Sequence, residues 1–297
     1  MRAACDVVVV GGAGVDTIVR VPALPVPLSD SVPVPPIHDY VAHTGNGVAL
    51  GCHALGLRTS FVDAIGDDPQ GALIRERYRR EGLDFHHVIS PAGTARSVNL
   101  VDADGRRQSL YDGRHPADLR LPPGSYRPLL DATRHVHLSI MNFSRALIPE
   151  LLERGLPFST DLHDWDGENP YHRDFAYAAD IVQVSTTALG DRVEAVLAGI
   201  LERGRARVVV ATAGADGSWV WPRGGALVRV PAVTPRPVVD SNGAGDAFCA
   251  GFLYGYLAGR PPVECARLGA LAGGWACGTA GTHTSFLTAA ELAALAG

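Results

Sequence analysis

The chain has 297 residues, of which 46% are hydrophobic and 19% charged, a composition typical of a globular protein with a sizeable buried core. Its formal net charge of −5 gives no electrostatic reason to expect nucleic acid or an anionic membrane as a partner. No apolar run approaches the ~20 residues of a membrane span, and the N-terminal stretch lacks the features of a secretory signal, so we predict a cytoplasmic protein.

The cysteines and the cationic side chains exclude further classes. The five cysteines are scattered without a C-x-x-C pair, which favours buried thiols over a disulfide framework or a zinc site. The combined Lys and Arg count is 26, and all of these residues are arginine. Walker P-loop proteins, protein kinases and Schiff-base enzymes require a lysine and are excluded in their usual forms. Phosphate chemistry here must therefore depend on backbone N–H groups, arginine and metal ions.

The N-terminal third begins with a strand of the buried type. Val7 to Val10 form an apolar run that leads into a glycine turn. A proline-dense segment over 22–36 cannot form a helix interior or a central strand, so it predicts extended structure outside the main sheet. The patterns that follow predict helices over 47–57 and 70–81, a strand over 59–64, and a hairpin over 96–111 with its turn at 102–105.

Strands and helices alternate through the rest of the chain. We predict strands over 135–140, 156–161, 181–184 and 208–211, a hairpin around Trp219 and Trp221, and helices over 144–154, 191–204, 245–257 and 263–277. Such alternation indicates a parallel sheet with helices on both faces. The segments over 20–44 and 93–113 do not fit that sheet, and we expect them to pair as a small lid. Without a repeat or linker, residues 1–297 are expected to form a single domain.

Two of the three glycine turns carry little information by themselves. The first, G-G-A-G-V-D, ends at Asp16 and would need glycine at position 17 for a G-x-G-x-x-G dinucleotide motif, but Thr17 stands there. A tight turn that directs Asp16 toward a ligand is the better interpretation, with an NAD-dependent oxidoreductase as the alternative. The second turn, over 212–217, is typical of an ordinary hairpin.

The third turn lies in the stretch V-V-D-S-N-G-A-G-D-A-F, residues 238–248. Gly243, Ala244 and Gly245 lead directly into a helical pattern, where backbone N–H groups and the helix dipole together favour an anion. Such an anion hole does not need lysine. Asp246 would lie in the first helical turn, and from the residues alone it is either a helix-stabilising acid or a functional carboxylate.

The D-S-N-G-A-G-D-A-F run resembles the C-terminal signature D-T-x-G-A-G-D of the PfkB (ribokinase-like) carbohydrate kinases. The G-G-A-G-V-D turn, the G-D-D-P-Q-G run over 66–71 and the T-A-G-A-D-G turn follow in family order. Within that family, the runs G-G-A-G-V-D-T-I and S-T-D-L-H-D-W-D-G are similar to the acarbose 7-kinase group. The resemblance implies an α/β, ribokinase-like three-layer α/β/α fold with a mostly parallel central sheet and a small β lid.

The family resemblance also implies an activity and residue roles. It implies transfer of the γ-phosphate of ATP, with Mg²⁺, to a hydroxyl of a sugar or sugar-like pseudo-oligosaccharide, with acarbose and its 7-hydroxyl as the specific expectation. Asp246 would be the general base, Gly243, Ala244 and Gly245 the anion hole, and Asp16 a ligand of acceptor hydroxyls. The residues expected at the nucleotide are Thr212, Gly214, Gly217, Asn242, Ala276, Cys277 and Gly281. A requirement for a monovalent cation and a homodimer through the lid remain open.

Three departures from the family pattern bear on the acceptor and the metal. The family's G-G-x-x-x-N aligns with residues 42–47, where both diglycine positions have changed. Its N-x-x-E aligns with residues 185–188, which lack the carboxylate, so Asp161 or Asp240 would hold Mg²⁺ through water. Its D-x-N-x-R aligns with residues 161–165, where Trp165 replaces arginine and offers a face for stacking on a sugar ring.

These departures cluster around the acceptor and the phosphates, so they predict altered specificity. The further acceptor contacts that we expect are His43, Asn46, Arg96, Tyr111, Asp161, His163 and Trp165. The alternatives are a monosaccharide kinase of the fructose or ribose type, a nucleoside kinase of the same family, and a non-catalytic sugar-binding relative, the last suggested by the missing glutamate.

Overall fold

The computed structural model describes residues 4–296. Its first strand shows why the main sheet lies in the middle of the molecule. In β1 (Val7–Val10), Val8 and Val10 join one hydrophobic cluster while Val7 and Val9 join another. Because successive side chains of a strand point to opposite faces, four consecutive buried valines require a cover on both sides.

Within residues 4–296, nine strands form this sheet in the order β13-β12-β11-β10-β9-β8-β1-β4-β5. Neighbouring strands are parallel, except that β12, near one edge, is antiparallel to both of its neighbours, β11 and β13. Besides β1, the strands are β4 (Thr59–Ile65), β5 (Asp84–Ile89), β8 (Val136–Leu138), β9 (Phe158–Asp161), β10 (Ile181–Ser185), β11 (Val208–Thr212), β12 (Ser218–Pro222) and β13 (Val228–Val230). Parallel strands bring their carboxyl ends to a common edge, the usual place for a ligand site in such a sheet.

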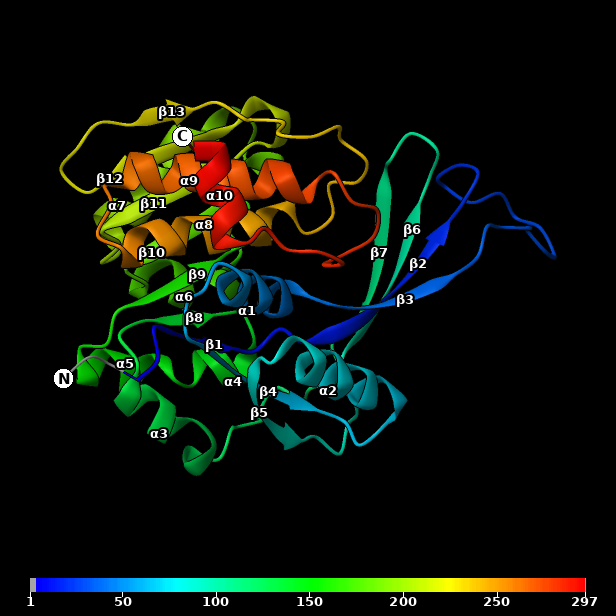
Figure 1. Cartoon of the computed structure of the whole chain (residues 1–297), viewed down its shortest axis with the longest axis horizontal. Coiled ribbons are helices and arrows are strands. Elements are labelled where there is room, and N and C mark those ends of the chain that lie inside the picture. The colour runs from blue at the N-terminus through cyan, green and yellow to red at the C-terminus, as the bar shows by residue number, and fades with distance from the viewer. Residues whose placement is uncertain (1–3, 297) are drawn as a thin grey trace.

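Helices cover both faces, which gives the three-layer α/β/α architecture predicted from the sequence (Figure 1). One face packs against α3 (Pro123–Ala132), α4 (Asn142–Arg145), α5 (Ile148–Arg154), α6 (Arg173–Ala178) and α7 (Val193–Arg203). The other packs against α1 (Thr44–Ala54), α2 (Pro69–Glu81), α8 (Ala244–Leu257), α9 (Pro262–Ala276) and α10 (Ala289–Ala296). Among the described residues, none of these helices is both long and apolar enough to cross a membrane.

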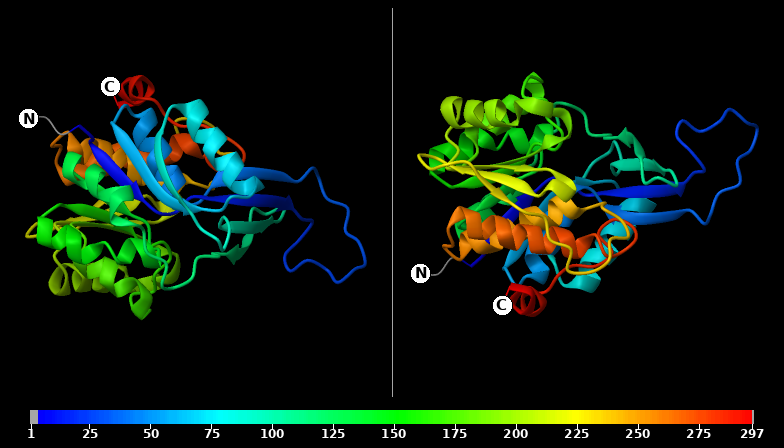
Figure 2. Two further views of the ribbon diagram at one scale, coloured as in Figure 1. Left: turned by 90° about the horizontal axis from the view of Figure 1, so that it is seen from below. Right: turned by 90° about the horizontal axis from the view of Figure 1, so that it is seen from above.

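A second, four-stranded sheet projects from the main body (Figures 1 and 2). Its order is β3 (His38–Ala42), β2 (Gly14–Arg20), β6 (Arg96–Val101) and β7 (Arg107–Asp112). The proline-dense residues 21–37 contain no strand and form a long loop at its far end. We call β3-β2-β6-β7 the small sheet; β2 continues from the carboxyl end of β1 through the first glycine turn.

Several predicted boundaries are wrong. The small sheet starts at Gly14 rather than at residue 20, because β2 pairs in parallel with β6 and is not part of a tight turn. Helix α1 begins at Thr44, three residues before the predicted start at 47. The predicted helix over 144–154 is two helices, since Pro149 lies in the first turn of α5 and cannot continue an earlier helix.

Candidate active site

Gln183 joins the two polypeptide segments that form the centre of the site. It lies on β10, where its Nε2 donates to Asp161 Oδ2 at the end of β9 (2.9 Å) and to the Gly245 carbonyl at the start of α8 (3.1 Å). The glycine turn before α8 is thereby held against the carboxyl edge of the main sheet. Sequence reasoning did not identify Gln183, because a polar residue within a buried strand has no distinctive spacing.

The glycine turn forms the start of α8 as predicted from its sequence pattern. Gly243 is the N-cap, in the left-handed region with φ 79°, and Asp246 lies in the first turn. A Cβ added at Gly245 would meet only Gln183 Nε2, at 4.0 Å, apart from its own helix and chain neighbours. The first N–H groups of a helix have no intrahelical acceptor and lie at the positive end of its dipole. This bare backbone surface fits an anionic group such as a phosphate.

Two carboxylates lie close together beside this surface. Asp161 is only 6% exposed, whereas the Asp246 side chain retains 16% of its accessibility. Burial is the main cause that raises the pKa of Asp161, and the charge of Asp246 raises it further, while His163 acts in the opposite direction. Asp246 is therefore the more exposed of the two carboxylates and the one that an incoming hydroxyl reaches more readily.

The small sheet contributes a polar and aromatic cluster on the other side of the site. His43 Nε2 lies 3.2 Å from Asp16 Oδ1 and 3.2 Å from Ser97 Oγ, and its ring centroid is 5.7 Å from that of Tyr111. A Cβ at Gly14 would lie 2.1 Å from the His43 ring, so glycine is needed there for the imidazole to pack. The structure thus brings together three predicted acceptor contacts: Asp16, His43 and Tyr111.

Arg96 does not belong to this cluster. The register pairs Asp16 with Ser97, and Ser97 with Tyr111, in one row across the small sheet. Arg96 is paired with Val15 and Asp112, one position out of that row. Since side chains alternate between faces, Arg96 lies on the opposite face from Asp16, so the register does not support the predicted contact between Arg96 and the acceptor.

Trp165 also departs from its predicted role. Its side chain is 1% exposed, packs within the core near the rings of His172 and Tyr177, and donates from Nε1 to the Asn169 carbonyl (3.0 Å). An indole buried in this way has no face available for a sugar. His163, two residues earlier, remains at the site, with its backbone N–H donating to Asp161 Oδ1 (2.9 Å) and Nε2 lying 3.3 Å from Thr44 Oγ1.

Asn46 is equally inaccessible. It is fully buried in α1, and its Nδ2 donates to the Val41 carbonyl (3.1 Å) and contacts His283 Nδ1 (2.9 Å). Its burial and its partners do not support the predicted direct contact between Asn46 and the acceptor. Its partner His283 was not identified from the sequence, although His283 Nε2 lies 2.8 Å from Asp246 Oδ2. A single histidine in a loop has no signature in a sequence.

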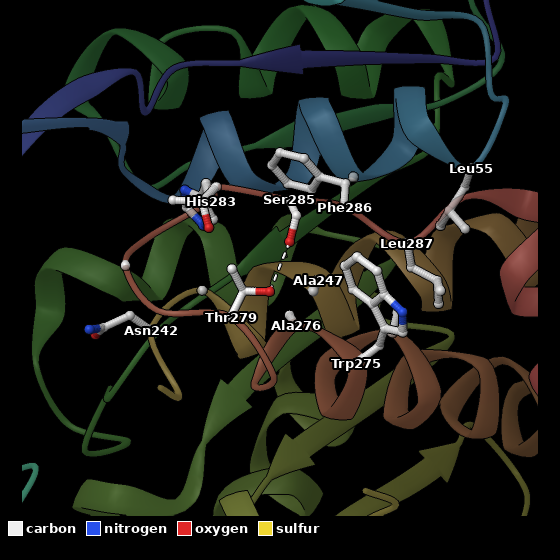
Figure 3. Close-up of a pocket in the computed structure, with 15 residues that line it drawn as sticks. Leu55, Asn242, Ala247, Trp275, Ala276, Thr279, His283, Ser285, Phe286 and Leu287 are labelled. Atoms are coloured by element: carbon white, nitrogen blue, oxygen red, sulfur yellow. Dashed lines mark hydrogen bonds between the residues drawn. The ribbon is translucent and has the colours of Figure 1, made fainter. Parts of the chain in front are cut away.

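The predicted nucleotide contacts divide into two groups. Asn242, Ala276 and Gly281 line a pocket bounded by α1, α8, α9 and the loop over 277–288 (Figure 3). The pocket is completed by Gly51, Leu55, Gly243, Ala247, Ala272, Trp275, Thr279, His283, Thr284, Ser285, Phe286 and Leu287. The Cys277 carbonyl accepts from the N–H groups of Val239 and Asp240, so Cys277 ties this loop to the segment before the glycine turn.

The turn after β11 lies outside that pocket. Thr212 ends β11 beside Ser185, and Gly214 opens the short turn that leads to β12. Gly217 has φ 88°, and a Cβ there would lie 2.2 Å from the Val230 carbonyl oxygen. Close packing on β13 therefore accounts for this glycine without reference to a ligand.

Two arginines of the small sheet reach the segment before the glycine turn. Arg20 Nη2 donates to Asp240 Oδ2 (3.0 Å), which also accepts from the Gly281 N–H (3.2 Å). Arg107 Nη1 donates to Asn242 Oδ1 (2.7 Å). In a chain without lysine, these guanidinium groups bring positive charge to the segment that precedes the anion-binding surface. Asp240 is engaged by Arg20, which leaves Asp161 as the better candidate for a metal ligand through water.

No group of three or more His, Cys, Asp or Glu side chains in residues 4–296 is arranged to hold a metal ion. Mg²⁺ in phosphate-transfer sites keeps several waters and needs only one or two carboxylates besides the phosphates. The neighbouring Asp161 and Asp246, beside the bare backbone of Gly245, fit that requirement.

The site agrees with what the comparisons with known proteins show. The model of the pfkB family of carbohydrate kinases matches residues 178–289, which include the glycine turn and Asp246. A protein named acarbose 7(IV)-phosphotransferase, from Actinoplanes sp., is 48% identical over 290 residues, or 97% of each chain. The chain belongs to the pfkB family of carbohydrate kinases. Fructoselysine 6-kinase of Escherichia coli is 33% identical over 77% of this chain and 85% of its own.

Solved structures support the same assignment. The structure of the microbiome-derived acarbose kinase Mak1 shares 50% identity with this pfkB kinase and superposes with a TM-score of 0.91 over 99% of both chains. A ribokinase from Arabidopsis thaliana superposes with a TM-score of 0.84 at 20% identity, which supports the ribokinase-like fold.

Family membership makes the chain an ATP-dependent phosphotransferase with an alcohol group of a sugar or sugar-like compound as acceptor. The alternative of an NAD-dependent oxidoreductase is wrong. The first glycine turn leads into strand β2 and not into a helix, so this turn does not form the strand–turn–helix unit that binds a dinucleotide pyrophosphate.

Proposed function

We propose that this pfkB kinase transfers the γ-phosphate of ATP to the 7-hydroxyl of acarbose or a closely related pseudo-oligosaccharide. The observation that carries the proposal is the identity of 48% over 97% of both chains with acarbose 7(IV)-phosphotransferase. The sequence identity of 50% to Mak1, in a superposition that covers 99% of both chains, supports the proposal.

Asp246 is the general base of the proposed reaction. An alcohol is a poor nucleophile at neutral pH, and a positioned base contributes ~10² to 10⁴-fold to such a step. The Asp246 carboxylate takes the proton of the acceptor hydroxyl while the oxygen forms its bond to the γ-phosphorus. Its side chain, 16% exposed in the first turn of α8, is next to the surface that would hold the phosphate.

The anion hole is the backbone from Gly243 to Asp246, with Gly245 open to an approaching phosphate. When bound, ATP with Mg²⁺ supplies the phosphoryl group and neutralises part of its charge. Asp161 would hold the metal through water, and Arg20 and Arg107 add positive charge from the small sheet. On the acceptor side, Asp16, His43, Tyr111 and His163 are the proposed contacts.

Asn242, Ala276 and Gly281 are proposed to contact the nucleotide from the pocket near α9. The pocket's apolar wall includes Trp275 and Ala276, and its polar groups include Thr279 and Ser285, whose hydroxyls lie 3.1 Å apart (Figure 3). Closure of the small sheet as a lid, a homodimer through it, a monovalent cation and a cytoplasmic location remain predictions.

The test is release of ADP from Mg-ATP by the purified chain with acarbose, ribose, fructose and adenosine as acceptors. We expect acarbose to give the highest kcat/KM and the product to carry its phosphate on the 7-hydroxyl, as assigned by NMR. A higher kcat/KM for a monosaccharide or a nucleoside would replace acarbose by that acceptor and leave the kinase assignment intact.

The base is tested separately with Asp246→Asn, for which we expect kcat to fall by ~10² to 10⁴-fold. Asp131→Asn, on the exposed surface of α3, is the matched control and should keep the wild-type rate. Turnover of Asp246→Asn at the wild-type rate would show that Asp246 is not the base.

A further inference from the structure

We infer that His283 is a positioning residue, which holds the carboxylate of Asp246 in one orientation through a hydrogen bond from its Nε2–H. The inference rests on the proposed role of Asp246 as the base. His283 lies in the loop after α9, far from Asp246 in sequence, and is among the few non-glycine residues with positive φ, at 56°. Non-glycine residues keep such a conformation only where surrounding structure enforces it, often at functional sites.

The contact between the two side chains is short and shielded from water. His283 Nε2 lies 2.8 Å from Asp246 Oδ2, and the His283 side chain retains 4% of its accessibility against 16% for that of Asp246. A hydrogen bond to a carboxylate in such surroundings is stronger than one in water. The Asp246 carboxylate is therefore held at one oxygen, which leaves Oδ1 for the acceptor.

Asn46 determines which ring nitrogen of His283 carries the hydrogen. Its Nδ2 lies 3.1 Å from the Val41 carbonyl oxygen, and since a carbonyl only accepts, the amide nitrogen must face Val41. The same Nδ2 lies 2.9 Å from His283 Nδ1 and donates its second hydrogen there. His283 Nδ1 is consequently the acceptor, and the ring hydrogen resides on Nε2, facing Asp246.

Two glycines make room for this imidazole. A Cβ at Gly47 would lie 2.3 Å from His283 Nε2 and 2.6 Å from Asp246 Cβ. A Cβ at Gly243 would lie 2.6 Å from His283 Cδ2. Glycine inside a helix is less favourable than alanine, so its presence at position 47 in α1 has a structural reason in the space that the His283–Asp246 pair occupies.

The arrangement assigns the proton a single destination. The acceptor hydroxyl gives its proton to Asp246 Oδ1 as its oxygen forms the bond to the γ-phosphorus and the bond from that phosphorus to ADP breaks. His283 cannot take this proton, because its Nε2 already bears hydrogen and its Nδ1 faces the amide donor of Asn46. It orients the base and is not a second base.

The test compares His283→Leu, which removes the donor, with His283→Gln, whose amide can donate to Asp246 and accept from Asn46. We expect His283→Leu to lower kcat on the order of 10- to 100-fold, the size typical of a misplaced reacting group. The KM values for acarbose and ATP should stay near those of the wild type. His283→Gln should restore most of the lost kcat, and His53→Gln, on the surface of α1, should have no effect.

A wild-type kcat in His283→Leu, an effect confined to KM, or equal losses in the Leu and Gln variants would overturn the inference. If His283→Leu does not fold, Gly47→Ala is the second variant. Its Cβ would displace His283 and crowd Asp246 Cβ, so kcat should fall, and an unchanged kcat would overturn the inference. Asp246→Asn separates this result from the proposed function. An inactive Asp246→Asn beside a fully active His283→Leu would refute only the role of His283, whereas a fully active Asp246→Asn would refute the base.

Discussion

Arg20 and Asp240 form an ion pair with Nη2 and Oδ2 3.0 Å apart, which joins the small sheet to the segment before the anion-binding turn. The two residues are separated by 220 positions in the chain. The side chain of Asp240 is 8% exposed and that of Arg20 is 42% exposed, so the carboxylate has little solvent to replace its partner. The pair keeps a negative charge next to the proposed phosphate site neutralised.

Arg20→Ala should therefore raise the KM for ATP, because the unpaired Asp240 would repel the phosphates. We expect an increase of roughly 5- to 30-fold, equivalent to about 1–2 kcal/mol. Steady-state kinetics with saturating acceptor measures it. Arg79→Ala, on the exposed surface of α2, is the control for loss of a cation elsewhere. Equal KM values for ATP in Arg20→Ala and wild type would contradict the prediction.

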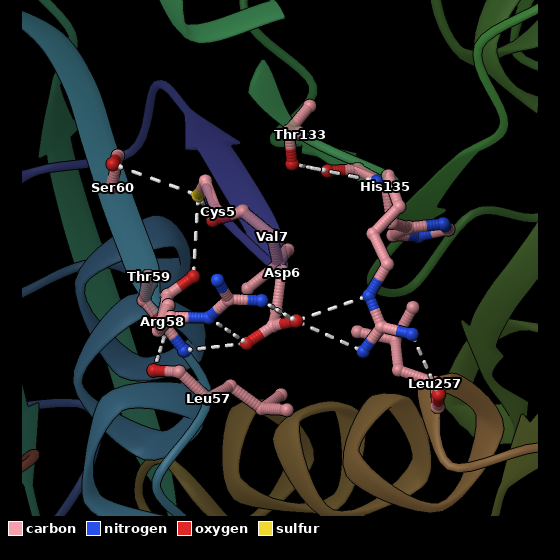
Figure 4. A network of polar contacts seen from close by, with 11 residues as sticks. Cys5, Asp6, Val7, Leu57, Arg58, Thr59, Ser60, Thr133, His135 and Leu257 are labelled. Carbon is pink, nitrogen blue, oxygen red and sulfur yellow. Dashed lines mark hydrogen bonds and ion pairs between the residues drawn. The ribbon is translucent and has the colours of Figure 1, made fainter. Parts of the chain in front are cut away.

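Asp6→Asn should destabilise the fold in a pH-dependent way. Asp6 lies beside Arg58, with a nitrogen–oxygen distance of 2.8 Å (Figure 4). Arg134 lies 3.0 Å from the same carboxylate. The hydrogen bond from Arg58 is the main cause that lowers the pKa of Asp6 to about 2. Because this pKa is below its unfolded value, the contribution is complete above about pH 4 and disappears as the pH falls toward 2.

Both arginines are about half exposed, with accessibilities of 50% and 46%, so solvent screens part of the effect. We expect Asp6→Asn to lower the free energy of unfolding by about 1–2 kcal/mol at pH 7, measured by urea denaturation. Glu76→Gln is the comparison, since the pKa of Glu76 is also lowered to about 2 by its hydrogen bonds to Arg79 and Arg80 at the surface. The loss of stability caused by Glu76→Gln should vanish in high salt. If the loss caused by Asp6→Asn were equally sensitive to salt, the prediction would be refuted.

Asp63 should make the protein less stable as the pH rises toward neutrality. Burial raises the pKa of Asp63 to about 7, although its carboxylate accepts from the N–H groups of Ala13 (2.5 Å) and Ala64 (2.7 Å). Between about pH 4 and 7 the unfolded chain releases a proton that the folded protein keeps, so the free energy of unfolding falls in this window. The fall amounts to at most ~4 kcal/mol.

Asp63→Asn removes this titration. Urea denaturation at several pH values between 5 and 7.5 should show that the variant loses less stability with rising pH than the wild type does. The two N–H groups face different oxygens of the Asp63 carboxylate, so the NH₂ group of asparagine would face one of these donors, and a lower absolute stability is expected at every pH. Parallel curves for the two proteins would show that Asp63 is already ionised in the folded state.

Truncation of Trp165 should lower stability, whereas truncation of Tyr111 should raise the KM for acarbose. Trp165→Ala leaves a cavity in the core and should lower the free energy of unfolding by ~3–5 kcal/mol. Trp165→Phe, which keeps an aromatic ring at this position, should fold and keep the wild-type KM for acarbose. Tyr111→Ala removes a ring that is 58% exposed next to His43, and it should raise that KM with little change in stability. If Trp165→Phe raised the KM for acarbose, the original interpretation of the indole as an acceptor contact would be correct.

The sequence by itself determined the fold class and the general chemistry. Strands such as Val7–Val10 are read from consecutive apolar residues, and the start of α8 from the glycines before a helical pattern, because such signals lie within one element. The absence of lysine excluded the kinds of phosphate site that depend on a lysine side chain, and the signature around Asp246 indicated a pfkB kinase. Each of these inferences needs only neighbouring residues or the whole composition.

Only the tertiary structure decided which side chains of the site are available to a ligand. Trp165 follows the site residue His163 by two positions, yet it is enclosed in the hydrophobic core, with His172 and Tyr177 close to its ring. The pairs Arg20–Asp240 and His283–Asp246 join elements that meet only when the chain is folded. Spacing along a chain reports which face of its own helix or strand a residue occupies, whereas exposure and partners depend on what the rest of the chain places against that face.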